Sequence, residues 1–205
     1  MSKQGVVFIV SGPSGTGKGT IMTEYFKRYP NDLSFLSVSA TTRTPRPGEI
    51  DGQNYYFLSK DEFEKMISED GLAEWAEFCG NYYGTPKKPV NDMIAEGKNV
   101  ILEIEVQGGR KVKECFENAV GIFVLPPSFA ELKNRLTSRG TETVDVIEKR
   151  LKRAKEEIEE INWYDYILIN DNLDEAVETF RSILIGESQR VFRNKKTIEE
   201  VCEKC

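Results

Sequence analysis

Apolar runs of strand length recur along the chain, and most of them are followed by a stretch with helical signals. Buried or half-buried strands are predicted at residues 6–10, 36–39, 99–106, 121–125 and 164–170. Residues 37–95 break this alternation, because they add strand patterns at 55–58 and 72–78 and a loop with two prolines and two glycines at 40–52. We interpret this strand-rich unit as an insertion that closes over a second ligand.

Helix starts are marked by capping patterns. Ser or Asn followed three residues later by Glu occurs at 59–62, 128–131 and 172–175. The last of these predicts a final helix at 173–192, followed by a charged tail that we expect to fray. Residues 141–143 restart a helix that is predicted to run to about residue 161, with one apolar stripe at spacings of four and three. With the helix before Gly140 it forms a hinged arm.

The turn after the first strand holds the motif around which the chain is organised. Residues 12–18 match the G-x-x-x-x-G-K spacing of a phosphate-binding P-loop, with a strand before it and a helix after it. The glycines let main-chain N–H groups surround an anion, and the helix adds its positive dipole end. Lys18 supplies a charge for the β and γ phosphates. The next position usually holds Ser or Thr for magnesium. Here it is Gly19, with Thr20 one residue late, so we expect a magnesium contact from elsewhere, through water.

Composition excludes several kinds of binding partner and of catalytic site. The 205 residues carry a formal net charge of -6, which argues against non-specific binding to polynucleotides or anionic membranes. No run reaches the length of a membrane span and no signal-peptide pattern is present, so we expect a cytoplasmic protein. The absence of histidine excludes Ser-His and Cys-His catalysis and the common zinc sites. Cys202 and Cys205 form a C-x-x-C, for which a frayed tail is favoured over metal binding or a cross-link.

Two groups of arginines are candidates for binding phosphate. Arg43 and Arg46 lie in the proline-stiffened loop, where two guanidinium forks suit a bidentate grip. Arg139, Arg150 and Arg153 lie in the helical arm, with Arg153 one turn after Arg150. The alternative for both groups is a solvated surface, on which the arginines of the arm only pair with neighbouring glutamates.

Together these motifs closely resemble the guanylate kinase family. The resemblance is carried by GPSGTGK at 12–18, SVSATTRTPR at 37–46, EWA at 74–76 with NYYG at 81–84, and RGTET at 139–143. It extends from about residue 6 to residue 184, and the second segment is highly specific to the family. The resemblance implies a P-loop nucleoside-monophosphate kinase, which transfers the γ-phosphate of ATP to GMP or dGMP and gives ADP and GDP.

The implied fold is α/β, with a parallel five-stranded P-loop sheet, helices on both faces, an inserted mixed α/β GMP-binding region and a helical lid. The single domain at about 5–184 would comprise a P-loop core at 1–36, 96–128 and 162–205, the GMP-binding region at 37–95 and the lid at 129–161. Mg2+ would accompany ATP. Neither nucleic acid nor membrane is expected as a partner, and a homo-oligomer is left open.

The resemblance also assigns site residues by position. Catalysis would depend on Lys18, Arg43, Arg139 and Arg150. ATP would be bound by Gly12, Pro13, Ser14, Gly15, Thr16, Gly17, Lys18, Gly19, Thr20, Arg135 and Asn170. GMP would be bound by Ser39, Arg43, Arg46, Tyr55, Glu74, Tyr83, Thr85 and Glu105. No direct protein ligand is assigned to magnesium, and Glu103 and Glu105, where many relatives have Asp, are candidates for contact through water.

The chemistry of guanine agrees with the role of Glu74. Guanine presents N1–H and its 2-amino group side by side, and an ionised carboxylate offers two acceptor oxygens to match them. Adenine has an acceptor at N1 and no 2-amino group, so it would leave the carboxylate unpaired. Two alternatives stay open: a catalytically silent guanylate-kinase-like module that binds a protein partner, and a kinase for another nucleoside monophosphate.

Overall fold

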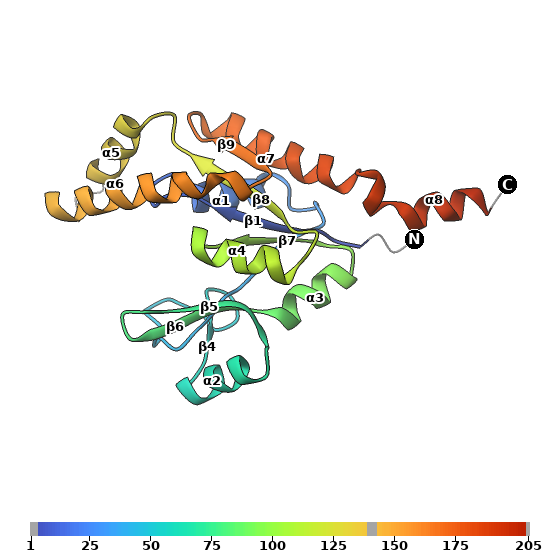
Figure 1. The fold of residues 1–205 in the computed structure, drawn as a ribbon, viewed down its shortest axis with the longest axis horizontal. Helices are drawn as coiled ribbons and strands as arrows, with labels where there is room; N and C mark the ends of the chain where they lie inside the picture. Colours follow the sequence, from blue (N-terminus) through green and yellow to red (C-terminus); the bar gives the residue numbers. More distant parts are fainter. Residues whose placement is uncertain (1–3, 139–142, 204–205) are drawn as a thin grey trace.

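The structure, a computed structural model, describes residues 4–138 and 143–203. Its centre is a five-stranded sheet in the order β2-β7-β1-β8-β9 (Figure 1). The strands are β1 (Val7–Ser11), β2 (Ser34–Leu36), β7 (Asn99–Glu103), β8 (Val120–Leu125) and β9 (Tyr166–Ile169). Neighbouring strands in this order all pair in parallel. The parallel five-stranded α/β fold implied by the resemblance is therefore confirmed.

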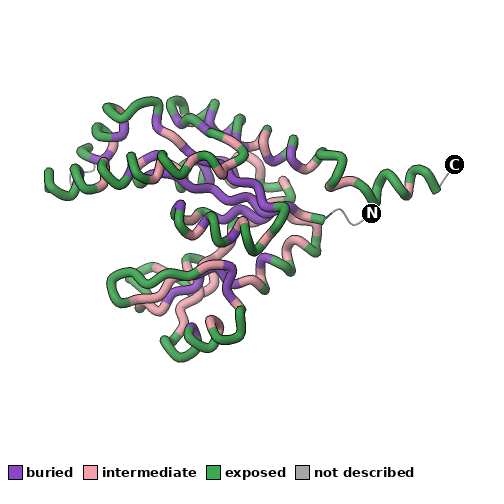
Figure 2. The backbone as a smooth tube through the Cα atoms, viewed as in Figure 1, coloured by how far each residue is buried: buried purple, intermediate pink, exposed green. Residues whose placement is uncertain are grey.

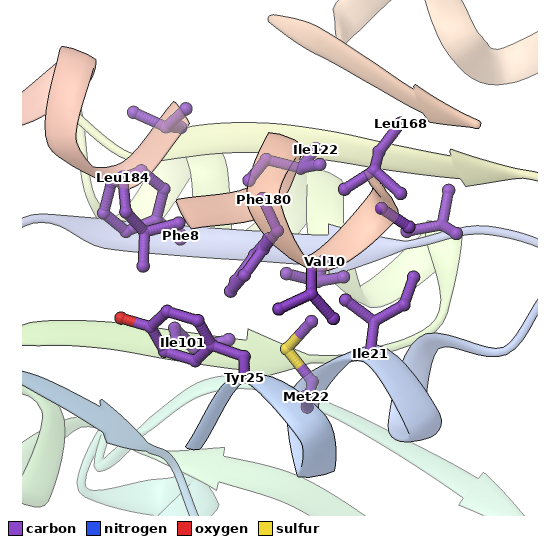
Figure 3. Packing of buried hydrophobic residues seen from close by; sticks show 14 of the residues in the cluster. Phe8, Val10, Ile21, Met22, Tyr25, Ile101, Ile122, Leu168, Phe180 and Leu184 are labelled. Carbon is purple, nitrogen blue, oxygen red and sulfur yellow. The ribbon is translucent and has the colours of Figure 1, made fainter. Parts of the chain in front are cut away.

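Helices cover both faces of this sheet. Successive side chains of β1 point to opposite faces and all are apolar or small, so each face needs helices to bury it. The covering helices are α1 (Lys18–Arg28) and α7 (Leu173–Ser188) on one face, and α3 (Lys87–Ala95) and α4 (Val106–Cys115) on the other. Phe8 belongs to the first cluster, together with Met22 and Phe180 (Figure 3). Ile9 belongs to the second cluster, together with Val90. The turn that follows β1 therefore starts from a strand buried on both faces.

A second, smaller sheet is formed by the segment between β2 and α3. Its order is β4-β3-β6-β5. The strands are β3 (Ala40–Thr41), β4 (Tyr56–Phe57), β5 (Leu72–Phe78) and β6 (Asn81–Pro86). Helix α2 (Lys60–Ser68) packs on this sheet through Phe63, which clusters with Ala40 and Leu72. The capping box predicted for this helix is confirmed, because Ser59 and Glu62 each accept a hydrogen bond from the main-chain N–H of the other.

Two helices form an arm beside the P-loop end of the large sheet. They are α5 (Phe129–Ser138) and α6 (Val144–Glu159), and the 3-10 turn η1 (Glu160–Trp163) leads from α6 toward β9. Leu132 and Leu136 of α5 pack against Ile147 and Ala154 of α6. The outer ends of both helices extend past the sheet (Figure 1). No helix in the described part of the chain is both long enough and apolar enough to cross a membrane.

Some predicted boundaries were wrong where a sheet partner decides the structure. The strand expected at 36–39 ends at Leu36, and residues 37–39 link the two sheets. Ala40–Thr41, expected in an irregular loop, is strand β3 because β4 and β6 flank it. The strand expected at 99–106 ends at Glu103, and Val106 begins α4.

The C-terminal prediction was also wrong. Helix α7 ends at Ser188 rather than at 192, and the tail continues into η2 (Val191–Arg193) and helix α8 (Lys195–Cys202). The side-chain amide of Asn194 donates to the carbonyls of Ser188 (3.1 Å) and Arg190 (2.9 Å), which fixes the break between the helices. Cys202 is exposed, and Cys205 lies outside the described residues.

Candidate functional site

The P-loop lies between β1 and α1, where the large sheet ends. Gly12 has a φ of 143° and Gly17 a φ of 88°, which L side chains rarely adopt. A Cβ at Gly12 would lie 2.3 Å from the carbonyl oxygen of Val124, and one at Gly17 would lie 2.4 Å from Nδ2 of Asn170. These two glycines let the loop lie directly against the ends of β8 and β9.

Lys18 is held inside this loop by main-chain oxygens. Its Nζ donates to the carbonyls of Gly12 (2.6 Å) and Pro13 (3.1 Å). Burial lowers the pKa of Lys18, and the negative charges of Glu103, Glu157 and Glu105, in that order, act to raise it. The ammonium group is therefore surrounded by oxygens and is placed to move onto an incoming anion.

Two other residues expected to bind ATP, Asn170 and Arg135, lie at the loop, together with Arg150, which is expected to serve catalysis. Asn170 donates through Nδ2 to the carbonyl of Thr16 (2.8 Å), and its own carbonyl accepts from Nη2 of Arg135 (3.0 Å). Arg150 of α6 donates through Nη1 to Oγ of Ser14 (3.4 Å). The arm thus reaches the P-loop, which the surface-pairing alternative did not expect. Arg139, the remaining expected cation of the arm, lies outside the described residues.

Glu103 is a carboxylate that lies beside the start of α1. It ends β7 in register with Val10 of β1, and a Cβ at Gly19 would lie 3.7 Å from its Oε2. Glu103 keeps exposed surface, yet desolvation by its neighbours raises the pKa of its carboxyl, and the charge of Lys18 acts to lower it. Among the described residues no three His, Cys, Asp or Glu side chains gather into a metal site. One carboxylate beside a phosphate-binding loop fits Mg2+, which usually keeps several waters and binds substrate phosphates.

Two of the residues expected to bind GMP meet across β5 and β6. Glu74 and Thr85 are register partners, and Oγ1 of Thr85 donates to Oε1 of Glu74 at 2.8 Å. Burial raises the pKa of the Glu74 carboxyl, the bond from Thr85 acts to lower it, and the charge of Glu105 acts to raise it. Gly108 of α4 faces this carboxylate, since a Cβ there would lie 3.0 Å from Oε2 of Glu74. A glycine at this position leaves one carboxylate oxygen accessible.

A second cluster gathers residues expected to bind the GMP phosphate. The guanidinium carbon of Arg43 lies 5.5 Å from the centre of the Tyr55 ring, and the rings of Tyr55 and Tyr83 meet edge to face at 6.1 Å. Nη2 of Arg43 donates to Oε1 of Glu49 at 2.8 Å. The other oxygen of Glu49 accepts the main-chain N–H of Arg46 at 2.7 Å. Glu49, which the sequence analysis did not assign to the site, therefore orients the guanidinium of Arg43 and holds the main chain at Arg46.

The remaining assigned residues are positioned by the chain around them. Ser39 lies in the link between the sheets, where its carbonyl accepts the N–H of Tyr56 at 2.9 Å. Glu105 lies just after β7, and its Oε2 accepts from Nη2 of Arg153 at 2.6 Å. The sequence analysis grouped Arg153 with the arm arginines that are candidates for binding phosphate and did not connect it with Glu105. Its partner is 48 residues away in the sequence, so no local spacing signals the contact.

Comparison with known proteins agrees with this geometry. The sequence model of the guanylate kinase family matches residues 4–187. The guanylate kinase of Caldanaerobacter subterraneus subsp. tengcongensis is 52% identical over 195 residues, which cover 95% of this chain and 94% of that protein. The guanylate kinase of Bacillus cereus is 50% identical over 202 residues, 98% of each chain. The crystal structure of guanylate kinase from Anaplasma phagocytophilum has a TM-score of 0.73 at 33% identity and covers 93% of this chain and 90% of that one. The chain therefore belongs to the guanylate kinase family.

Proposed function

We propose that this chain is an ATP:GMP phosphotransferase, which converts ATP and GMP (or dGMP) into ADP and GDP for guanine nucleotide synthesis and recycling. One observation carries the proposal beyond family membership. Glu74, held by Thr85, presents a carboxylate suited to guanine in a chain whose P-loop keeps its glycines and Lys18. A module that only binds proteins needs neither feature.

The ATP half of the reaction is assigned to the large sheet and the arm. The phosphates are bound by the main-chain N–H groups that the P-loop offers, with Lys18, which leaves its two carbonyl partners when the anion arrives. Arg135 and Asn170 lie on the loop, on the side proposed for adenine. Residues 129–161 act as the lid, whose Arg150, with Arg139, brings positive charge to the transferring phosphoryl group.

The GMP half is assigned to residues 37–95. Ionised Glu74 accepts N1–H and the 2-amino group of guanine, while Thr85 and Ser39 contribute hydroxyl groups to the base site. The phosphate of GMP is gripped by the cluster of Arg43, Arg46, Tyr55 and Tyr83. Glu105 lies between the two halves and faces the base. Because the site is built to accept guanine's donors, nucleobases without them leave the half-buried carboxylate with only its bond from Thr85, which is costly.

The transfer itself needs no protein nucleophile. The GMP phosphate oxygen attacks the γ-phosphorus in line, and catalysis consists of positioning two mutually repelling anions and stabilising their charge. Lys18 and Arg150 supply charge from the ATP side, and Arg43 supplies it from the GMP side. Glu103 would reach a Mg2+ ion through water, and the ion would supply further charge neutralisation. Closure of the lid excludes water, which would otherwise take the γ-phosphate.

A nucleotide panel tests this proposal. The purified chain is supplied with Mg·ATP and, separately, AMP, UMP, CMP, GMP and dGMP, and both ADP release and the diphosphate product are measured. Turnover with GMP and dGMP, and little with the others, is expected. No ADP with any acceptor would leave a silent binding module, and a preference for another base would overturn the role of Glu74. A cytoplasmic location and a homo-oligomer stay predictions.

A further inference from the structure

Glu105 has an unusual position for a carboxylate at the start of a helix. It is the N-cap residue of α4, yet its side chain makes no capping hydrogen bond. An N-cap acid ordinarily turns back to accept an N–H of the first helical turn. Here the carboxylate is 76% exposed and turned away from the helix, onto Nη2 of Arg153 at 2.6 Å. Arg153 therefore determines where this carboxylate points.

Arg153 is itself held from the other side. Its Nε donates at 2.9 Å to Oε1 of Glu157, one turn further along α6. The Glu157 side chain is 16% exposed, so this partner is fixed more firmly than Glu105. The planar guanidinium thus spans two carboxylates, one on its own helix and one beside the base site. A planar fork is suited to such a bridge, and a lysine ammonium is not.

We propose that Arg153 is a positioning residue for guanine recognition, acting through Glu105 and anchored by Glu157. The inference rests on the proposed function, in which Glu105 faces the base. Arg153 takes only Oε2 of Glu105, which leaves Oε1 to accept a donor of the base. The same bridge links α6, part of the proposed lid, to the start of α4, so lid position and base binding are coupled through one ion pair.

Replacement of Arg153 tests the inference through the separation of two Michaelis constants. In Arg153→Ala the KM for GMP is expected to rise about two- to five-fold, the range for a partly exposed ion pair, with the KM for ATP unchanged. Arg153→Lys is expected to restore only part of the loss, because one ammonium cannot bridge both carboxylates. Lys152→Ala is the matched control, since Lys152 is the preceding residue of α6 and pairs only loosely with Glu156 at 4.0 Å.

A double-mutant cycle identifies the path of the effect. If Arg153 acts through Glu105, Arg153→Ala has no further effect on the KM for GMP in a Glu105→Gln background. Full additivity of the two changes, or an equal rise in both Michaelis constants, would overturn the inference. An unchanged KM for GMP in Arg153→Ala would do the same. Because wild-type turnover with GMP is measured first, failure of the proposed function is distinguished from failure of this inference.

Discussion

The two regions proposed to bind ATP and GMP are built on cores of very different depth. Phe8, Ile9 and Val10, which lead into the P-loop, are 0% exposed, whereas Trp75 and Phe78, which follow Glu74 on β5, are 38% and 65% exposed. The contrast is visible in the tube view, where buried positions concentrate in the large sheet and exposed ones border the small sheet (Figure 2). The P-loop therefore rests on a deep core, and Glu74 rests on a thin one.

The difference follows from what each site must recognise. Phosphates are common to all nucleoside triphosphates, and main-chain N–H groups fixed by a buried sheet are sufficient to bind them. A base is distinguished by the pattern of its donors and acceptors, which requires side chains such as Glu74 and partners such as Thr85. Side chains on the small sheet are held by a thinner core than the main-chain groups of the P-loop. Core substitutions in the two regions should therefore have different effects on nucleotide binding.

Phe63→Ala is expected to have the largest effect and to separate the two regions. Phe63 is fully buried and stacks on Tyr82 with ring centres 5.4 Å apart. Replacing a buried phenylalanine by alanine costs about 3–5 kcal/mol, which a small core cannot absorb. GMP binding should be lost while ATP binding persists, as measured by calorimetry, with faster hydrogen exchange confined to the small sheet.

Phe180→Ala is the matched control for this change. Phe180 is also fully buried, but it belongs to the cluster of the large sheet. Its removal should lower the unfolding temperature of the whole chain and weaken both nucleotides together. If Phe63→Ala also weakened ATP binding to the same extent, the two regions would form one cooperative unit and the comparison would fail.

Lys18→Ala is expected to have the next largest effect, on turnover. Removal of one preorganised group that stabilises transition-state charge typically costs about 10²–10³ in kcat. GMP affinity, measured by equilibrium dialysis without ATP, should stay near the wild-type value. Lys27→Ala on the same helix is the control, because Lys27 pairs with Glu24 at the surface. A wild-type kcat in Lys18→Ala would remove the P-loop lysine from the mechanism.

Glu74→Gln tests recognition of the base. The amide keeps one acceptor oxygen and loses the other, and a hydrogen bond to a charged group contributes about 1.5–3 kcal/mol. The kcat/KM for GMP should fall about 10- to 100-fold, with the KM for ATP unchanged. Glu77→Gln, on the exposed half of the same strand, is the control. Equal loss for both substrates would contradict a role in reading guanine.

Local motifs explain why the sequence predicted one region better than the other. The P-loop is encoded by contiguous residues, so its strand, turn and helix were predicted together. Strand β3 has only two residues and no pattern of its own, and it exists because β4 and β6 flank it. In the sequence of the tail only the charge was noticed, and fraying was predicted from it. In the structure Asn194 orders the chain there, because its side-chain amide donates to two carbonyls of the preceding turn.

The same reasoning applies to the site. Glu74 and Thr85 were assigned through the family resemblance, and their pairing depends on the register of β5 and β6. Glu49 was not assigned to the site, and Arg153 was considered only as a phosphate-binding candidate, because the contacts of both residues are not encoded in a local motif. Glu49 lies within reach of two arginines in its own loop, which is a signal that could have been used. The contact from Arg153 to Glu105 crosses between distant elements, and only the fold brings them together.

The pH dependence of base recognition is the smallest expected effect. Burial raises the pKa of Glu74 above its usual value, so this carboxyl protonates at a higher pH than an exposed one. The protonated form carries a hydrogen on one oxygen and cannot accept both guanine donors. The KM for GMP should therefore rise as pH falls through this raised pKa, and it should rise more in the wild type than in Glu74→Gln, where only the GMP phosphate, with a second pKa of about 6, still titrates.

Protonation of Glu74 should weaken GMP binding but favour the folded state. This difference in sign distinguishes titration of Glu74 from general acid denaturation. A carboxyl whose pKa is higher in the folded state than in the unfolded state stabilises the fold below its unfolded pKa, and that stabilisation is lost as pH rises through the folded pKa. Glu74→Gln cannot ionise, so its free energy of unfolding should gain on the wild type as pH rises, by up to about 1.4 kcal/mol per unit of pKa shift. Denaturant titrations of both proteins across that window check this. A wild type that gained on the variant instead would mean that Glu74 is stabilised as a carboxylate in the free protein.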